Sequence, residues 1–177
     1  MTKRILLTGR PGSGKTTLIQ RVVNDLALPV GGFYTKEIRE RGVRVGFKLV
    51  TLDGKESVFA DVNFKTTERI GKYGLDLSEL ETFGVAAIRE AVHARQLVVI
   101  DEIGPMEIRS SIFRDAVNEA FDSDIPILAT IVARSLPFTD AIKARSDVYI
   151  LEVRLSNRQE LLSKLRDEFK SLSLGTK

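Results

Sequence analysis

Eight residues close to the amino terminus have the types and spacing that bind a phosphate chain. Residues 9–16 match the pattern G-x-x-x-x-G-K-[ST] at every fixed position. Glycines let such a loop turn its backbone N–H groups inward around phosphate oxygens, and the lysine reaches the β- and γ-phosphates. We therefore expect a nucleoside triphosphate to be bound by Gly9, Arg10, Pro11, Gly12, Ser13, Gly14, Lys15, Thr16 and Thr17.

Two acidic residues follow an apolar run further along the chain. Asp101 and Glu102 come directly after Leu97–Ile100, and carboxylates at the end of a buried strand are costly unless a cation compensates them. We expect the Thr16 hydroxyl and Asp101, the latter through bound water, to hold Mg²⁺. Glu102 is placed to act as general base on an attacking water, alongside Lys15 and Asp101 as catalytic residues. The alternative is that Glu102 lies on the surface or holds a neighbouring loop.

Other polar residues near strand ends leave more than one interpretation open. Thr130 and Arg134 could sense the γ-phosphate or stabilise transferred charge, or could be a core hydroxyl and a solvated arginine. Arg145 is a weaker candidate of the same kind. Glu107 could support the acidic pair or simply begin a helix, and the polar cluster in residues 72–76 could line the site.

The elements that must position these residues follow from the spacing of apolar side chains. Helical spacing alternates with short apolar runs, which favours an α/β domain with a parallel sheet covered by helices on both faces. Ligands of such sheets bind at the carboxyl ends of the strands, where these motifs fall. Strands are expected near residues 3–8, 97–100, 125–132 and 148–153, and helices near 16–26, 78–91 (capped by Ser78), 108–120 and 156–169.

Residues 32–64 differ from this alternation. Apolar residues at positions 43, 45, 47 and 49 alternate with polar residues and glycine, and turn signals flank them. This pattern predicts an antiparallel hairpin or meander appended to the main sheet. We expect one domain over residues 1–170 and a frayed tail over residues 171–177.

Composition limits the classes of function that remain. The net charge is only +3, from 27 basic and 24 acidic residues with no basic tract, so nucleic acid is not an indicated partner. The chain has no cysteine, no signal-peptide pattern and no apolar stretch long enough to cross a membrane. We expect a cytoplasmic protein without a membrane partner, and a monomer as the default state.

At four stretches the chain resembles a known family, the small P-loop nucleoside-triphosphatases first described in thermophiles, which includes the human cancer-related nucleoside-triphosphatase. The stretches are residues 9–17 (GRPGSGKTT), 31–47 (GGFYTKEIRERGVRVGF), 72–77 (KYGLDL) and 99–107 (VIDEIGPME). The resemblance implies a three-layer, RecA-like P-loop fold in which the strand ending near Thr130 lies between the two motif strands. By position it extends the nucleotide site to Val98, Val99, Ile100, Asp101, Glu102, Ile103, Gly104 and Pro105.

The resemblance also implies a function. It implies Mg²⁺-dependent hydrolysis of ATP, GTP and other nucleoside triphosphates to diphosphate and phosphate, with little base selectivity and slow turnover. The residues themselves leave two alternatives open: a small-molecule or nucleotide kinase using the same loop, and a nucleotide-dependent RNA-binding or regulatory module. A kinase would need a phosphoryl acceptor and a closing lid.

Overall fold

A single mixed sheet organises the part of the chain that this computed structural model describes, residues 3–173. Its strand order is β5-β6-β4-β3-β2-β7-β8-β1-β9. The strands are β1 (Arg4–Thr8), β2 (Val30–Glu40), β3 (Val43–Thr51), β4 (Glu56–Asp61), β5 (Arg69–Ile70), β6 (Tyr73–Leu75), β7 (Leu97–Ile103), β8 (Ile127–Ile131) and β9 (Tyr149–Glu152).

The central part of the sheet is parallel. β2 pairs with β7, β7 with β8, β8 with β1 and β1 with β9, all in parallel register. β8 therefore lies between β1, which leads into the phosphate-binding loop, and β7, which leads into the acidic pair. This arrangement confirms the expected α/β fold and the expected place of the strand that ends near Thr130.

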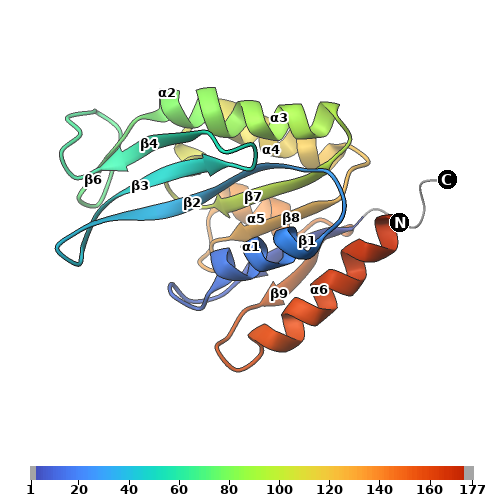
Figure 1. The fold of residues 1–177 in the computed structure, drawn as a ribbon. Coiled ribbons are helices and arrows are strands. Elements are labelled where there is room, and N and C mark those ends of the chain that lie inside the picture. The colour runs from blue at the N-terminus through green and yellow to red at the C-terminus, as the bar shows by residue number, and fades with distance from the viewer. Residues whose placement is uncertain (1–2, 174–177) are drawn as a thin grey trace.

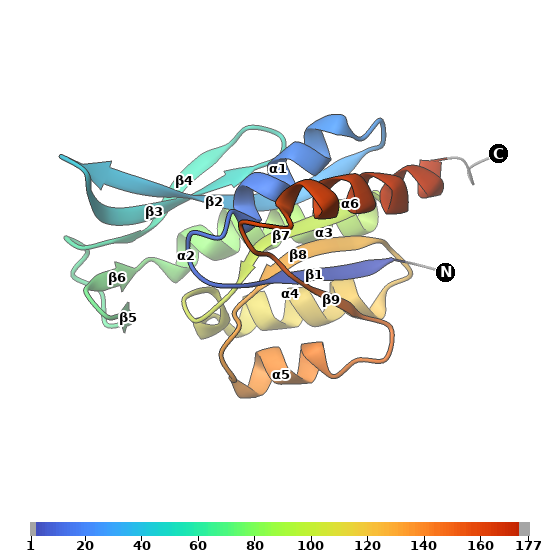
Figure 2. The same ribbon diagram turned by 90° about the horizontal axis from the view of Figure 1, so that it is seen from below.

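Helices cover both faces of the sheet, as Figures 1 and 2 show. Val98 and Ile100 of β7 belong to the apolar cluster on one face, whereas Leu97 and Val99 belong to the cluster on the other. This strand is thus buried on both faces, as its continuous apolar run predicts. One face is covered by α1 (Lys15–Asp25) and α6 (Arg158–Ser173), and the other by α2 (Leu77–Glu79), the π-helical turn η1 (Leu80–Val85), α3 (Ala86–His93), η2 (Glu107–Arg109), α4 (Ser111–Asp122) and α5 (Pro137–Lys143).

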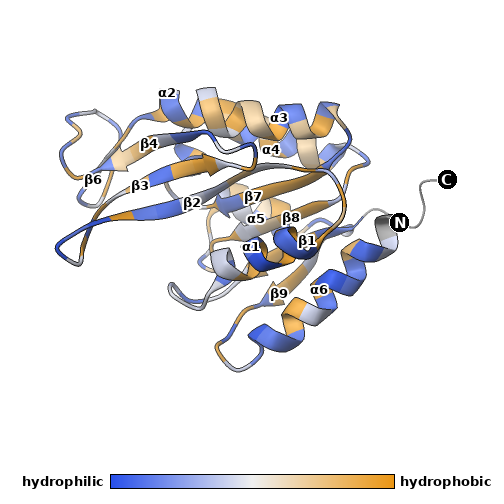
Figure 3. Cartoon of the chain, viewed as in Figure 1, coloured by the Kyte–Doolittle hydropathy of each residue, from blue (hydrophilic) through white to orange (hydrophobic). Residues whose placement is uncertain are grey.

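The predicted hairpin exists, but it shares a strand with the parallel sheet. The first residues of β2, Val30 to Tyr34, pair with β7, and the same strand then runs on to pair antiparallel with β3. The meander continues through β4 to β6 and β5. Hydrophilic residues gather along the outer part of this hairpin, whereas the central strands are apolar (Figure 3).

Three features differ from the expectations. α5, β5 and β6 are not among the predicted elements, because two to seven residues are too few for a periodic pattern to stand out. The helix that begins at Leu77 is capped by Asp76, whose carboxylate accepts from the N–H groups of Ser78 and Glu79, so Ser78 is not the cap. α6 continues to Ser173, three residues into the predicted tail, and residues 174–177 lie outside the described part.

Candidate active site

The phosphate-binding loop joins the carboxyl end of β1 to the amino end of α1. Gly12 and Gly14 have positive φ angles of 77° and 91°, a region that other residues rarely adopt. Lys15 begins the helix, and its Nζ donates to the carbonyl oxygens of Gly9 at 3.1 Å and Arg10 at 3.2 Å. The ammonium group is therefore held against the loop at the positive end of the helix dipole, an arrangement that suits a phosphate chain.

Packing beneath the loop requires its first glycine. A Cβ on Gly9 would lie 2.5 Å from the carbonyl oxygen of Val153, so only glycine fits between the loop and the segment after β9. Ser13 is buried, and its Oγ has no hydrogen-bond partner among the described residues. A buried hydroxyl without a partner is costly, and a phosphate oxygen in the loop would relieve that cost.

Asp101 lies at the end of β7, level with the loop. Its Oδ1 accepts from Thr130 Oγ1 at 2.5 Å, and the Thr16 hydroxyl and the Thr35 backbone N–H lie near its carboxylate. Burial raises the pKa of Asp101, while the hydrogen bond from Thr130, the nearby polar groups of Thr16 and Thr35 and the charge of Lys15 oppose that shift. The carboxyl group is therefore enclosed and tightly oriented.

The donor set around Asp101 fits a magnesium ion. Its Oδ2 is buried and has no hydrogen-bond partner among residues 3–173, and its carboxylate is within hydrogen-bonding reach of the Thr16 hydroxyl. The described residues contain no group of three or more His, Cys, Asp or Glu that could hold a metal. Mg²⁺ needs no such group, because it binds one or two protein oxygens and completes its shell with water and phosphate oxygens.

The carboxylates of Glu102 and Glu107 both lie close to Gly104. A Cβ on Gly104 would lie 3.1 Å from Glu102 Oε1 and 3.0 Å from Glu107 Oε2. Burial and then the charge of Asp101 raise the pKa of Glu102, and Lys15 opposes the shift. Glu107 is only 5% exposed, and burial together with the nearby Glu102 raises its pKa to about 8. Glu102 is thus a half-buried carboxyl group with a raised pKa near the phosphate-binding loop, which suits a general base.

Four apolar residues of the predicted nucleotide site have their side chains in the core. The side chains of Val98, Val99, Ile100 and Ile103 are fully buried in the two apolar clusters. They fix the strand that presents the acidic pair, and their place in a nucleotide site stays a prediction. The β7–β8 register shifts between Ile100 and Ile103, and the Asp101–Glu102 peptide bond within this irregularity is cis.

Of the two candidate arginines, the structure excludes one from the site. Arg145 donates to Asp122 at 2.7 Å and to Asp147 at 3.1 Å, and its guanidinium packs over the ring of Phe121. Asp122 ends α4, which leads into the amino end of β8, so Arg145 lies at the edge of the sheet opposite to the phosphate loop. Arg134 is exposed and follows the carboxyl end of β8, on the side where the acidic pair lies.

Comparison with known proteins agrees with this geometry. A family model described as NTPase matches residues 4–166 of the chain. The chain belongs to this NTPase family. The matched region includes the phosphate loop, the acidic pair and all nine strands.

Relatives named Nucleoside-triphosphatase THEP1 are similar over nearly the whole chain. The protein from Thermofilum pendens is 47% identical over 176 residues, covering 96% of this chain and 97% of the relative. The one from Thermotoga sp. (strain RQ2) is 46% identical over 162 residues, covering 92% of each. Among solved structures, THEP1 from Aquifex aeolicus aligns with a TM-score of 0.83 at 33% identity, covering 92% of this chain and 96% of that one. A human cancer-related nucleoside triphosphatase aligns with a TM-score of 0.81 at 34% identity, covering 96% and 98%.

Sequence reasoning missed or left open several parts of the site in this member of the NTPase family. Thr35 reaches Asp101 only because β2 and β7 pair with Tyr34 opposite Asp101, and a single sequence does not reveal that register. Thr130 is buried, and its hydroxyl donates to Asp101 Oδ1, a contact that the sequence did not reveal. The polar cluster in residues 72–76 lies in the meander instead, where the Tyr73 ring packs against Phe47 at 5.3 Å.

Proposed function

We propose that this chain hydrolyses nucleoside triphosphates to diphosphate and phosphate in a Mg²⁺-dependent reaction. The observation that carries the proposal is the placement of a half-buried carboxyl group, Glu102, beside the enclosed pair of Asp101 and Thr16 and level with the phosphate-binding loop. Relatives named nucleoside-triphosphatase support the same activity.

Each residue has a distinct task in this mechanism. The loop N–H groups and Lys15 hold the triphosphate and neutralise the charge that develops during transfer. Thr16 and Asp101 would hold Mg²⁺, which would supply further neutralisation of the phosphate oxygens. Glu102 accepts the proton of a water molecule and aligns that water with the γ-phosphorus. Lys15, Asp101 and Glu102 are the catalytic residues in this scheme.

The proposal extends to substrate range, rate and surroundings. We infer that ATP, GTP and other nucleoside triphosphates all serve, and that turnover is slow. Slow turnover is in line with the engagement of Arg145 elsewhere, since an arginine at the transferring group is worth roughly 10³–10⁵ in rate. We further propose a cytoplasmic monomer. Within residues 3–173, no helix is both long enough and apolar enough to span a membrane.

One observation favours a phosphotransferase as the second candidate. A cavity of about 340 Å³ beside Pro105 is lined by Arg109, Arg114 and Arg134, with Ile70, Ile108 and Leu136 completing its walls. Three arginines lining one cavity would suit a phosphorylated acceptor. Transfer of labelled γ-phosphate to nucleoside monophosphates, measured against release of free phosphate, distinguishes the two activities.

The test of hydrolysis is phosphate release from ATP and GTP with Mg²⁺. Glu102→Gln should still bind nucleotide but lose roughly 10²-fold or more in kcat, because the amide cannot take a proton. Lys15→Ala should lose nucleotide binding as well. Normal hydrolysis by Glu102→Gln, or no release by the native protein, would refute the proposal.

A further inference from the structure

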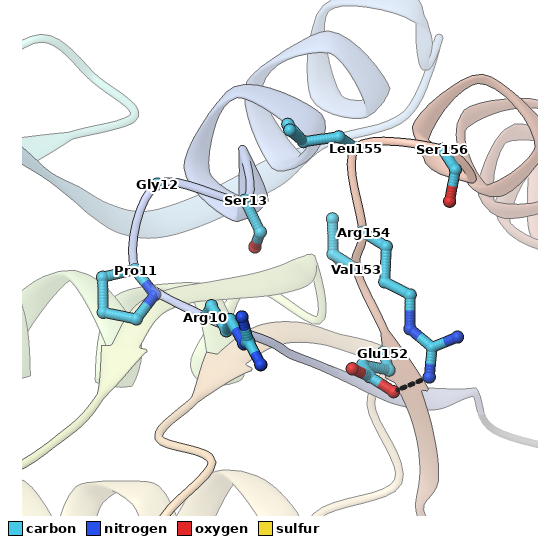
Figure 4. Close-up of a pocket in the computed structure, with 9 residues that line it drawn as sticks. All are labelled: Arg10, Pro11, Gly12, Ser13, Glu152, Val153, Arg154, Leu155 and Ser156. Atoms are coloured by element: carbon cyan, nitrogen blue, oxygen red, sulfur yellow. Dashed lines mark hydrogen bonds and ion pairs between the residues drawn. The ribbon is translucent and has the colours of Figure 1, made fainter.

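Two cavities lie at the carboxyl ends of the parallel strands, and they differ in their relation to the phosphate-binding loop. The larger, of about 660 Å³, is lined by residues 10–13 of the loop and by residues 152–156 at the end of β9 and beyond it (Figure 4). It therefore belongs to the triphosphate site. The smaller, of about 340 Å³, has no residue of the loop in its lining.

The smaller of the two, the arginine cavity, takes its name from Arg109, Arg114 and Arg134. It is lined by residues of β5, η2 and α4 and by the segment that follows β8. Of the residues expected to bind a nucleotide, Pro105 alone lines it, and the catalytic residues do not. A ligand in this cavity is thus held apart from the reacting groups.

The arginines of this cavity carry more positive charge than nearby carboxylates neutralise. Arg109 Nε pairs with Glu68 Oε2 at 3.3 Å. Within residues 3–173, Arg114 and Arg134 have no carboxylate partner. Three guanidinium groups and one carboxylate leave a net charge of about +2, which complements the charge of about −1.5 to −2 on a phosphate monoester near pH 7.

Arg114 is held in place by the protein itself. Its Nη1 donates to the carbonyl oxygen of Ile108 at 2.5 Å, which ties α4 to η2 and leaves its other N–H groups available. Arg114 is half-buried, whereas Arg109 and Arg134 are exposed. A fixed guanidinium group suits paired, charge-assisted hydrogen bonds to phosphate oxygens, and the two exposed arginines can add to them from the rim.

Apolar side chains form the rest of the arginine cavity. Ile70, Ile108 and Leu136 line it, and each is half-buried. Such side chains give nothing to a phosphate oxygen, but they shield the carbon skeleton of an organic group from water. The volume lies at the lower end of the range for small-molecule sites, about 300–1,000 Å³. A small monoester, such as a sugar phosphate, therefore fits this cavity better than a nucleoside triphosphate does.

We propose that the arginine cavity binds a small organic phosphate monoester while a nucleotide occupies the phosphate-binding loop. Arg109, Arg114 and Arg134 bind the phosphate group, and the apolar walls contact the carbon skeleton. Because the catalytic residues do not line the cavity, the ligand is not placed as a phosphoryl acceptor, in contrast to the second candidate function. Binding of this ligand does not depend on the hydrolytic activity, so the two proposals can fail separately.

The test uses ribose 5-phosphate as the probe, with Mg²⁺ and ADP saturating the loop. Calorimetry should show one probe bound per chain, about 10-fold or more tighter than inorganic phosphate, which has no carbon skeleton. Arg134→Ala removes an exposed side chain that has no carboxylate partner among the described residues, so the fold should be unaffected. It should weaken the probe by about 10-fold, and Arg114→Ala by at least as much.

The control is Arg89→Ala, which changes an exposed arginine paired with Glu119 at 2.8 Å on another part of the surface. It should leave the affinity for the probe within 2-fold. Lys15→Ala, without ADP, should bind the probe as the native protein does, because the loop takes no part.

Three results would overturn the second site. They are loss of probe binding when ADP is present, equal affinities for ribose 5-phosphate and inorganic phosphate, and unaltered probe affinity in both Arg134→Ala and Arg114→Ala. Label from the γ-phosphate of ATP should not appear on the probe, and its appearance there would make the ligand an acceptor. Absence of phosphate release from ATP would instead overturn the proposed function and leave this site standing.

Discussion

The acidic side chains of the parallel strands and those of the antiparallel meander have different surroundings. β7 and β8 are buried on both faces, and the carboxyl groups at the end of β7 are enclosed by protein. In the meander, Glu37 of β2 pairs at the surface with Arg39 at 2.6 Å and Arg44 at 2.8 Å. Asp101 and Glu107 in the first region are shielded from solvent and Glu102 is half-buried, whereas Glu37 in the second region has both solvent and cations beside it.

This difference favours the end of β7 over the meander as the place of proton transfer and metal binding. Burial raises the pKa values of Asp101, Glu102 and Glu107, while a hydrogen bond from Arg44 lowers that of Glu37. A buried carboxyl group with a raised pKa can bind a proton or a cation near neutral pH. A surface carboxylate that is already paired with an arginine gains little free energy from binding a ligand. Matched substitutions in the two regions test this contrast.

The largest contrast should come from two glycines with similar backbone angles. A Cβ on Gly32, whose φ is 106°, would lie 2.0 Å from the carbonyl oxygen of Val99, whereas a Cβ on Gly42, whose φ is 80°, would meet nothing within 4 Å. Gly32→Ala should therefore reduce the free energy of unfolding by about 4 kcal/mol or more, and Gly42→Ala by about 1–2 kcal/mol. Urea unfolding of both variants measures this, and equal losses would show that β2 is not clamped against β7.

The second contrast concerns two aspartates. Asp101→Asn removes a carboxylate beside Thr16 and should lower kcat by about 10²-fold or more, because Mg²⁺ would lose a ligand in the proposed mechanism. Asp53→Asn alters an exposed residue paired with Lys55 at 2.9 Å in the β3–β4 turn, and kcat should stay within 2-fold. Steady-state phosphate release measures both. A fully active Asp101→Asn would remove Asp101 from the metal site.

The third contrast is in how stability depends on pH, and Glu107 and Glu37 should affect it with opposite signs. The folded-state pKa of Glu107, about 8, exceeds the value near 4.3 of an unfolded glutamate. The native state therefore holds more protons between these values, and stability falls as pH rises through that window. The free energy of unfolding of Glu107→Gln should therefore fall by about 2–4 kcal/mol less than that of the native protein between pH 5 and pH 8.

Glu37 provides the matched control, since its pKa is lowered in the folded state. Its contribution to stability is present above the unfolded pKa and is lost as pH falls, so Glu37→Gln should flatten only the acidic limb of the stability curve. Urea midpoints measured from pH 3 to pH 9 report both effects. A native curve unchanged by Glu107→Gln between pH 5 and pH 8 would mean that Glu107 is ionised in the native protein.

The smallest contrast removes one hydroxyl from each region. Thr130→Val keeps the shape of the buried side chain but deletes the hydrogen bond to Asp101, and kcat/KM should fall by about 10-fold. Tyr73→Phe deletes a hydroxyl that accepts from Arg44 Nε at 2.9 Å, and it should cost about 1 kcal/mol of stability with kcat/KM within 2-fold. A Thr130→Val protein with native kinetics would assign Thr130 to the core alone.

The sequence predicted best those parts of the site that depend only on residues adjacent in the chain. The phosphate loop and the buried strand before Asp101 depend on neighbouring residues, so their positions could be predicted closely. The roles of Thr35 and Glu107 depend on strand register and on how tightly η2 closes over Gly104, which neighbouring residues do not encode.

The position of β1 between β8 and β9 also determines when the active site can form during synthesis. Arg4 pairs with Ile127 and Ile5 with Tyr149, so β1 forms its hydrogen bonds only with β8 and β9, which come last among the strands in the sequence. Such distant pairing is slow, because a long loop must close before the contacts compensate its entropy. On the ribosome, the phosphate loop therefore stays unsupported until most of the chain has emerged. A nascent chain cannot form the triphosphate site before the remainder of its fold is available.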